Sequence, residues 1–250
     1  MNIGIIIQAR MGSTRLPGKI LKKFDGEKTL LETLLENLHK VSGVKVIVAT
    51  SVNANNDQLE SFLLEKGELV YRGSESDVLD RFIQEAETNH VDGIVRICSD
   101  KPFLDWHGVS QLVEKAKTSD ADYIGFRIND KPSILTHFGF WGEFVTLSAL
   151  KRVASTTPVD SPAHEHVTWH IYNHPDEYKC EWIMCPEFLQ GRDDIRLTID
   201  TPEDLVNARK VFADLKGKDS NFTLKDVVSY LDAHAEIKQS MLNSISQNKK

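Results

Sequence analysis

Short runs of β-branched residues alternate with longer amphipathic segments through the first half of the chain. The run Ile3–Ile7 is typical of a strand buried on both faces, and residues 44–49 indicate a second buried strand. Residues 69–71, 93–97 and 123–126 indicate further strands. Between these runs, apolar residues recur at helical spacing, as at Leu31, Leu34, Leu35 and Leu38. This alternation predicts βαβ units, and therefore an α/β fold with a doubly wound, mostly parallel sheet.

The pattern becomes less regular between residues 131 and 186. Short aromatic runs, a histidine-rich segment and several prolines in this range indicate an inserted arm or dimerisation subdomain. Regular character returns at Ile195–Ile199, which has the pattern of another strand, and helices are predicted to begin at Pro202 and near Thr223. We therefore expect a single domain over residues 1–238 and a polar, frayed tail over 239–250.

Parallel sheets bind ligands beyond the carboxyl ends of their strands. Three polar segments follow predicted strands directly, at residues 8–19, 72–76 and 99–105. These segments are where we expect the chemistry of the protein.

The segment at residues 8–19 reads QARMGSTRLPGK and suits a polyphosphate ligand. Glycines let the backbone approach an anion, and the cations Arg10, Arg15 and Lys19 would neutralise it. The segment is not a Walker A loop, because the spacing between its glycines differs and Ile20 replaces the required hydroxyl residue. A solvated surface loop is the plainer alternative, but three cations at the end of the first strand favour phosphate binding.

Two aspartates, Asp100 and Asp200, follow predicted strands and are candidate ligands for one Mg²⁺ ion. Asp100 precedes Lys-Pro, so a simple turn is the alternative for it. Helix initiation explains Thr201, Pro202 and the acids after them, whereas Asp200 lies outside that cap. Magnesium usually takes few protein ligands and fills its remaining positions with water and phosphate oxygens.

His166 and His170 are spaced to share a helical face, as a zinc pair would. The HExxH order is absent and no third ligand is evident. We therefore expect a capping or interface role for these histidines.

The bulk composition excludes several functions. A formal net charge of -7 argues against non-specific nucleic-acid binding, which needs a basic surface. The three cysteines form no CxxC pair, and no apolar run approaches the length of a membrane span. The first residues lack the pattern of a signal peptide, so a cytoplasmic setting is expected.

Taken together, the motifs resemble the cytidylyltransferase family that activates acylneuraminate and 3-deoxy-manno-octulosonate, and especially its branch named after spore coat polysaccharide biosynthesis protein F. The segment at residues 8–19 is similar to the family's opening signature, and residues 72–82 resemble the segment leading into its third helix. EHVT at residues 165–168 and RLTIDTPED at residues 196–204 look like its late and closing motifs.

The resemblance implies a Rossmann-like, glycosyltransferase A-like nucleotidyltransferase fold and a reaction in which CMP passes from CTP to a sugar acceptor, releasing pyrophosphate. It implies that Mg²⁺ binds Asp100 and Asp200, which act in catalysis with Arg10 and Lys19. The implied nucleotide-binding residues are Ala9, Arg10, Gly12, Ser13, Thr14, Arg15, Lys19, Arg72, Gly73 and Glu75. The implied acceptor-binding residues are Lys101, Glu165 and His166.

Lys101 departs from the family pattern, which usually has a small or amide residue after the first aspartate. We expect its amine to reach either the acidic group of the acceptor or the α-phosphate of CTP. A lysine that points to solvent is the alternative.

Three other functions compete with the cytidylyltransferase interpretation. A glycosyltransferase usually has a DxD motif after a strand, whereas the only match here, at residues 120–122, precedes one. A nucleotidyltransferase acting on a sugar phosphate or polyol phosphate is the main alternative. A relative that only binds nucleotide is less favoured because both aspartates are retained.

A homodimer is expected from the aromatic content of the proposed arm. Its aromatic residues have too little periodic apolar sequence around them to form a separate core, so a partner subunit could bury them. Packing onto the main sheet is the alternative. The residues concerned are Phe138, Phe140, Trp141, Phe144, Trp169 and Tyr172.

Overall fold

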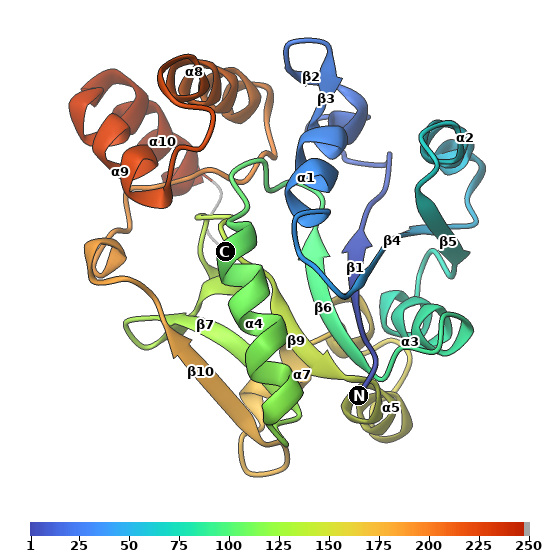
Figure 1. Cartoon of the computed structure of the whole chain (residues 1–250). Coiled ribbons are helices and arrows are strands. Elements are labelled where there is room, and N and C mark those ends of the chain that lie inside the picture. The colour runs from blue at the N-terminus through green and yellow to red at the C-terminus, as the bar shows by residue number, and fades with distance from the viewer. Residues whose placement is uncertain (248–250) are drawn as a thin grey trace.

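A mostly parallel sheet forms the centre of the molecule in a computed structural model that describes residues 1–247 (Figure 1). Its strands lie in the order β10-β7-β9-β6-β1-β4-β5, and β8 pairs with β7 at one end. The strands are β1 Ile3–Gln8, β4 Lys45–Ser51, β5 Leu69–Gly73, β6 Gly93–Cys98, β7 Tyr123–Ile128, β8 Lys131–Pro132, β9 Glu143–Thr146 and β10 Cys180–Met184. A separate hairpin consists of β2 Lys23–Asp25 and β3 Lys28–Thr29.

Helices cover both faces of this sheet, as the alternation of strands and helices predicted. The helices are α1 Leu30–Leu38, α2 Asp57–Glu65, α3 Val78–Thr88, α4 Trp106–Thr118, α5 Leu147–Thr156, α6 Pro162–Glu165, α7 Trp169–Asn173, α8 Pro202–Lys218, α9 Leu224–Ala233 and α10 Ala235–Gln247. Helices α8, α9 and α10 lie together at one end of the molecule, and α8 packs near β2 (Figure 1).

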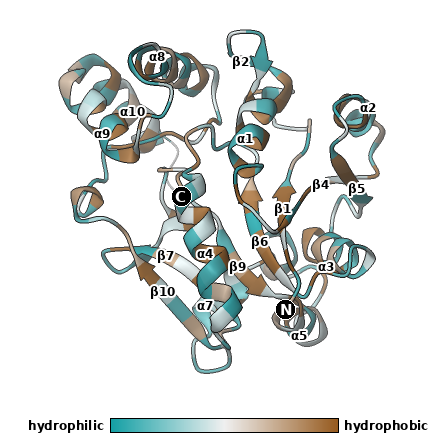
Figure 2. Ribbon diagram, in the orientation of Figure 1, coloured by the Kyte–Doolittle hydropathy of each residue, from teal (hydrophilic) through white to brown (hydrophobic). Residues whose placement is uncertain are grey.

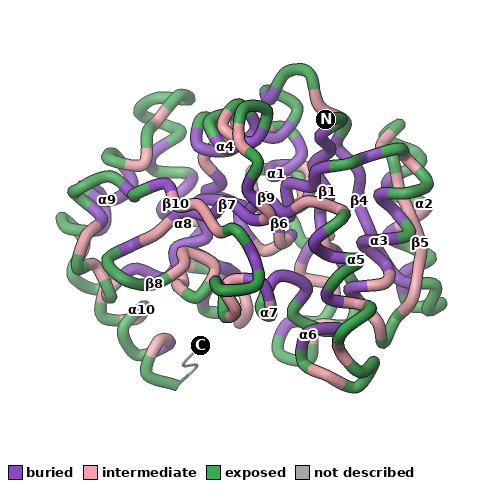
Figure 3. The backbone as a smooth tube through the Cα atoms, turned by 90° about the horizontal axis from the view of Figure 1, so that it is seen from below, coloured by how far each residue is buried: buried purple, intermediate pink, exposed green. Residues whose placement is uncertain are grey.

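Residues of β1 alternate between two hydrophobic clusters, because successive side chains of a strand point to opposite faces. Ile5 and Ile7 pack with α1, α2 and α4, whereas Ile6 packs with α3 and α5. The strands β1 and β6 are accordingly largely apolar along their length (Figure 2). They run through the buried interior, while the outer surfaces of the helices are exposed (Figure 3). The predicted buried strands are therefore confirmed.

Helices α1 and α8 begin with reciprocal capping boxes. Thr29 and Glu32 form a reciprocal capping box at the start of α1. Thr201 caps α8 together with Asp204, and Pro202 occupies the first turn. Helix α8 thus begins at the predicted residue.

The segment at residues 131–186 differs from the predicted arm, because it returns to the main sheet. It contributes β8, β9 and β10, and β9 runs antiparallel between β6 and β7. The four aromatic residues around β9 are at most 3% exposed within the single chain: Phe138, Phe140, Trp141 and Phe144. The argument for a homodimer does not hold for these four, since the chain itself already buries them. Trp169 is 37% exposed and Tyr172 is half-buried.

Two predicted elements near the carboxyl end have a different form. Ile195–Ile199 is buried but is not a strand of the described sheet. Its backbone instead joins two loops, because Leu197 N–H donates to His137 O at 2.9 Å and Ile199 N–H donates to Asp100 O at 3.0 Å. The predicted frayed tail is instead helical as far as Gln247, and Met241 within it is buried. The last three residues of the predicted tail lie outside the described range. No helix within residues 1–247 is long and apolar enough to cross a membrane.

Candidate active site

The strand register brings the predicted ligand segments to one edge of the sheet. Gln8 at the end of β1 lies opposite Ala49 on β4 and Cys98 on β6. The loops that follow β1 and β6 are consequently neighbours, and Ser99 N–H donates to Gln8 O at 3.2 Å. Residues 81 positions apart, such as Lys19 and Asp100, thus come into contact.

Hydrogen bonds to its backbone fix the conformation of the loop after β1. Met11 N–H donates to Asn56 Oδ1 at 2.9 Å, and Gly18 N–H returns to Met11 O at 3.1 Å. Gly18 has a φ of 65°, a left-handed conformation that favours glycine, immediately before the short helix of residues 19–21. Leu16 anchors the loop in the core, and Ala9 is buried at its base. The remaining predicted phosphate-binding residues are at least partly exposed along the loop: Arg10, Gly12, Ser13, Thr14 and Arg15.

Lys19 lies between the two predicted metal aspartates. Its Nζ is 3.4 Å from Asp100 Oδ2 and 3.2 Å from Asp200 Oδ1, and it donates to Ile199 O at 2.6 Å. Arg15 Nη2 lies 3.3 Å from the same Asp200 oxygen. Four residues that the sequence analysis selected from three separate motifs therefore form one cluster.

Charge pairing decides how these groups titrate. Burial alone would raise the pKa of Asp200, but Lys19, Arg15 and Arg196 outweigh burial and lower it. Burial alone would lower the pKa of Lys19, but Asp100 and Asp200 reverse that effect and raise it. Both changes favour the charged forms, so Asp200 is ionised and Lys19 is protonated at neutral pH.

Arg196 and Asp204 position Asp200, and the sequence analysis gave neither a role in the site. Arg196 Nη2 donates to Asp200 Oδ2 at 3.0 Å, and its Nε donates to Asp204 Oδ1 at 2.8 Å. Asp204 Oδ2 also accepts from the backbone N–H of Asp200 at 3.0 Å. The sequence did carry a signal for this pairing. Arg196 lies inside the predicted strand Ile195–Ile199, and a buried arginine there needs a carboxylate partner, which the acid of the following helix cap can supply.

The residues of the cluster fit a divalent cation. Asp100 Oδ1 is buried and has no hydrogen-bond partner among the described residues, which leaves it available as a ligand. Carboxylate oxygens are the ligands that Mg²⁺ prefers, and Lys19 already shows that a cation is stabilised between Asp100 and Asp200. Within residues 1–247, no group of three or more His, Cys, Asp or Glu side chains could hold a metal. Any ion here would depend on phosphate or water for its remaining ligands.

The guanidinium of Arg72, which the sequence analysis assigned to nucleotide binding, forms ion pairs with two acids on α2. Its guanidinium contacts Asp57 at 2.7 Å and Glu60 at 2.6 Å, and its Nε donates to Ser51 O at 3.1 Å. Arg72 therefore joins β5 to β4 and α2. The sequence could not reveal these ion pairs, because they depend on how α2 packs beside β5.

Gly73 and Glu75 stay close to the ligand edge. A Cβ at Gly73 would lie 2.9 Å from Arg81 Cγ, so glycine is needed for this close approach. Glu75 accepts a hydrogen bond from Ser51 Oγ, and Ser51 Oγ in turn accepts one from Asn56 Nδ2 at 2.7 Å. The same asparagine holds Met11, so this network connects the end of β5 to the phosphate loop.

Near the EHVT segment, the two residues predicted to bind the acceptor differ in burial from the histidine that precedes them. Glu165 and His166 are exposed, whereas His164 is buried and its Nδ1 lies 2.8 Å from Asp77 Oδ2. His170 stacks on His174 with ring centroids 4.0 Å apart, in agreement with a packing role.

Thr168 of the same segment belongs to a buried polar network centred on Glu143. Glu143 Oε1 accepts from Arg96 Nη1 at 2.6 Å and from Thr168 Oγ1 at 2.8 Å, and Glu143 Oε2 accepts from Tyr123 OH at 2.8 Å. Arg96 Nη2 also donates to Gln8 Oε1 at 2.9 Å. This network connects the EHVT segment to the strand that precedes the phosphate loop.

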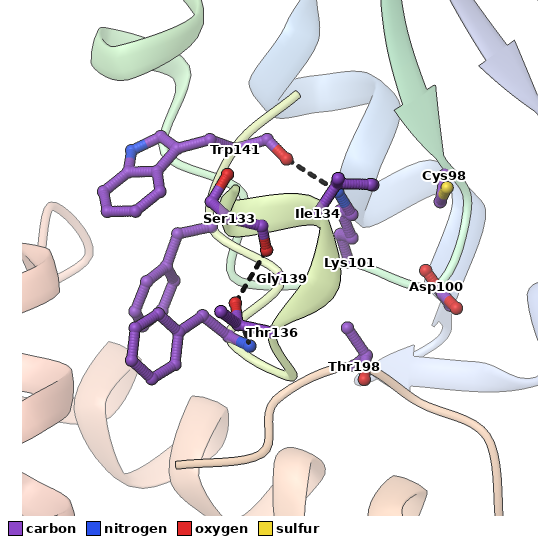
Figure 4. Close-up of a pocket in the computed structure, with 11 residues that line it drawn as sticks. Cys98, Asp100, Lys101, Ser133, Ile134, Thr136, Gly139, Trp141 and Thr198 are labelled. Carbon is purple, nitrogen blue, oxygen red and sulfur yellow. Dashed lines mark hydrogen bonds between the residues drawn. The ribbon is translucent and has the colours of Figure 1, made fainter. Parts of the chain in front are cut away.

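Lys101 is buried rather than solvent-exposed. It is 5% exposed, and its Nζ donates to Trp141 O at 2.6 Å, as Figure 4 shows. The solvent alternative is therefore wrong.

A Rossmann-like sheet with a cationic loop and paired aspartates at its carboxyl edge suits a protein that binds a nucleotide polyphosphate. A family model described as cytidylyltransferase matches residues 4–243. The chain belongs to the cytidylyltransferase family, and the enzyme class follows from this membership.

Individual relatives agree with this family. The chain is 33% identical over 216 residues to spore coat polysaccharide biosynthesis protein SpsF of Bacillus subtilis, covering 84% of this chain and 86% of that protein. A cytidylyltransferase from Leptospira borgpetersenii superposes with a TM-score of 0.81 at 27% identity, over 96% of this chain and 97% of that one. A CMP:2-keto-3-deoxy-manno-octonic acid synthetase complexed with CTP shares the fold, with a TM-score of 0.64 at 17% identity over 86% of this chain and 99% of that one.

Proposed function

We propose that this cytidylyltransferase transfers CMP from CTP to a hydroxyl group of an acidic sugar and releases pyrophosphate, with Mg²⁺ as its cofactor, in surface polysaccharide or glycan biosynthesis. The main support is the Lys19 ammonium held between Asp100 and Asp200, with Arg15 beside them. Such a cluster suits a metal–triphosphate complex, because its carboxylates suit the metal and its cations suit the phosphates.

The proposed reaction is an in-line displacement at the α-phosphorus of CTP. A bond forms from the sugar hydroxyl oxygen to this phosphorus, and the bond from the phosphorus to the α,β-bridging oxygen breaks. The hydroxyl proton is released to solvent. Arg10, Arg15 and Lys19 would stabilise the negative charge that collects on the departing pyrophosphate. Mg²⁺ held by Asp100 and Asp200 would supply Lewis-acid polarisation of the phosphate oxygens.

Thermal denaturation with each of four nucleoside triphosphates and Mg²⁺ tests the nucleotide. A ligand at a hundred times its Kd stabilises by about 2.7 kcal/mol, so the preferred nucleotide should stand apart clearly. We expect CTP to give the largest rise in melting temperature. Equal stabilisation by ATP and CTP would contradict the assignment.

Pyrophosphate release from CTP tests the acceptor. The candidate acceptors are 3-deoxy-manno-octulosonate and N-acetylneuraminate, compared with neutral sugars and with sugar or polyol phosphates. We expect release with at least one sugar acid. Release with phosphates alone would instead support a nucleotidyltransferase that acts on a sugar phosphate or polyol phosphate.

A further inference from the structure

Lys101 is a buried cation without a carboxylate partner. It is 5% exposed, and no Asp or Glu oxygen within residues 1–247 lies within 4.0 Å of its ammonium group. Arg96 and Arg196 are similarly buried, yet each contacts a carboxylate at 2.8 Å or less. Burying a charge is costly unless it is paired. The carboxylate partners explain the burial of the two arginines, whereas the burial of the Lys101 ammonium group needs another explanation.

A small pocket of about 50 Å³ lies against Lys101 (Figure 4). Asp100 and Cys98 line one side, and the turn of residues 133–139 lines another. The pocket thus adjoins the metal aspartate. A group bound in it would lie next to the reacting phosphate.

The walls of the pocket are rigid. Trp141 stacks on Phe126 with ring centroids 4.4 Å apart and an angle of 12° between the planes. Gly139 has a φ of 70°, and a Cβ there would lie 3.1 Å from Thr198 Cγ2. The Trp141 carbonyl that holds Lys101 is therefore fixed in place, and so is the ammonium group. A lysine with one hydrogen bond to a carbonyl still has two N–H groups to donate.

We propose that this pocket binds the carboxylate of the acceptor sugar, with Lys101 as its counter-ion and the sugar ring outside the pocket, directed toward the phosphate loop. A volume of about 50 Å³ suits one small planar group and excludes a whole sugar. Asp100 would repel a carboxylate, but the Lys19 ammonium 3.4 Å away offsets that charge. This inference rests on the proposed function and assigns its acidic-acceptor specificity to one residue.

Two variants of Lys101 separate anion binding from a structural role. Lys101→Met removes the charge and the hydrogen bond to Trp141 O. Lys101→Gln removes the charge but keeps an N–H donor for that carbonyl. Lys131→Met is the matched control, because Lys131 is an exposed lysine just before the same turn. The melting temperature of each variant, with and without CTP and Mg²⁺, shows whether the fold and the nucleotide site remain intact.

The measurement is equilibrium binding by calorimetry of a sugar acid and of its C1 amide, which lacks the charge. The probes are 3-deoxy-manno-octulosonate and N-acetylneuraminate, each added to enzyme saturated with Mg²⁺ and α,β-methylene-CTP, whose P–C–P linkage prevents transfer. We expect the wild type and Lys131→Met to favour acid over amide by about 10- to 100-fold, the contribution of a charge-assisted hydrogen bond. Both Lys101 variants should lose this preference.

The outcomes are distinct. A wild-type enzyme that binds acid and amide equally would overturn the proposal, as would retention of the preference in Lys101→Gln. Lys101 would have a purely structural role if Lys101→Met lowered both the melting temperature and the preference for acid over amide and Lys101→Gln restored both. If CTP fails to stabilise the wild type, the proposed function fails instead. The comparison of acid with amide, repeated without nucleotide, then still tests the pocket.

Discussion

Glu85 on α3 offers a quantitative test of how burial controls charge in this fold. Its side chain is fully buried, Oε1 accepts from Asn89 Nδ2 at 3.1 Å, and Oε2 has no partner among the described residues. Burial raises the pKa of Glu85 from 4.5 to about 7, against weaker opposing effects from Asn89 and Lys45. The folded protein therefore favours the neutral carboxylic acid.

The sign and size of the pH effect follow from linkage. Between pH 4.5 and about 7 the folded protein keeps a proton that the unfolded chain has released, so stability falls as pH rises through this window and then levels off. A pKa raised from 4.5 to about 7 corresponds to about 3 kcal/mol at 1.36 kcal/mol per pKa unit. Glu85→Gln keeps the shape and an acceptor for Asn89 but cannot ionise. We expect it to match the wild type near pH 4.5 and to be about 2–3 kcal/mol more stable at pH 8.

Urea denaturation of both proteins at pH 4.5, 6 and 8 measures this difference directly. Glu65→Gln is the control, since Glu65 is exposed on α2 and its substitution should produce no such trend. A Glu85→Gln effect that is constant with pH, or a wild type that is the more stable at pH 8, would refute the assignment of a neutral Glu85.

Three further predictions concern the site and the core. Asp200→Asn should lower the rate of pyrophosphate release on the order of 10²–10³-fold at saturating Mg²⁺, and a near-native rate would exclude Asp200 as a metal ligand. Arg72→Met should lower the melting temperature and leave the KM for CTP unchanged, because Arg72 contacts Asp57 and Glu60; a raised KM would restore its nucleotide role. Phe140→Ala should destabilise by about 3–5 kcal/mol in urea, and light scattering should show the same mass as the wild type.

Local patterns predicted the regular part of the fold because local physics decides it. The β-branched run of β1 must be buried on both faces, and Thr29 with Glu32 satisfies a helix start by itself. The placement of Lys19 near Asp100 followed from one general rule, that parallel strands end at the same edge. No contact between distant side chains had to be known for these predictions.

The features that the sequence could not predict all depend on contacts between distant segments. The strand β9 has only four residues, too few for a clear period, and its place between β6 and β7 is fixed by pairing with both. Arg72 lies in a segment that resembles a nucleotide-binding motif, but its guanidinium forms ion pairs with Asp57 and Glu60 of α2. The burial of Lys101 depends on the carbonyl of Trp141, which lies 40 residues further along the chain. Each side chain has a plausible local explanation that tertiary contacts override.

The cap of α8 and the candidate metal site are one structural unit. Asp204 accepts hydrogen bonds from the backbone N–H groups of Asp200 and Thr201, and it also binds Arg196, which holds the other Asp200 oxygen. Burial alone would raise the pKa of Asp204, but Arg196 and these backbone N–H groups lower it, so it remains a charged acceptor. The residues 201–204, TPED, are explained as a folding signal by the helix cap alone. The same cap also fixes the orientation of Asp200. The same residues act in folding and in the site, because the helix start is what holds the carboxylate at the edge of the sheet.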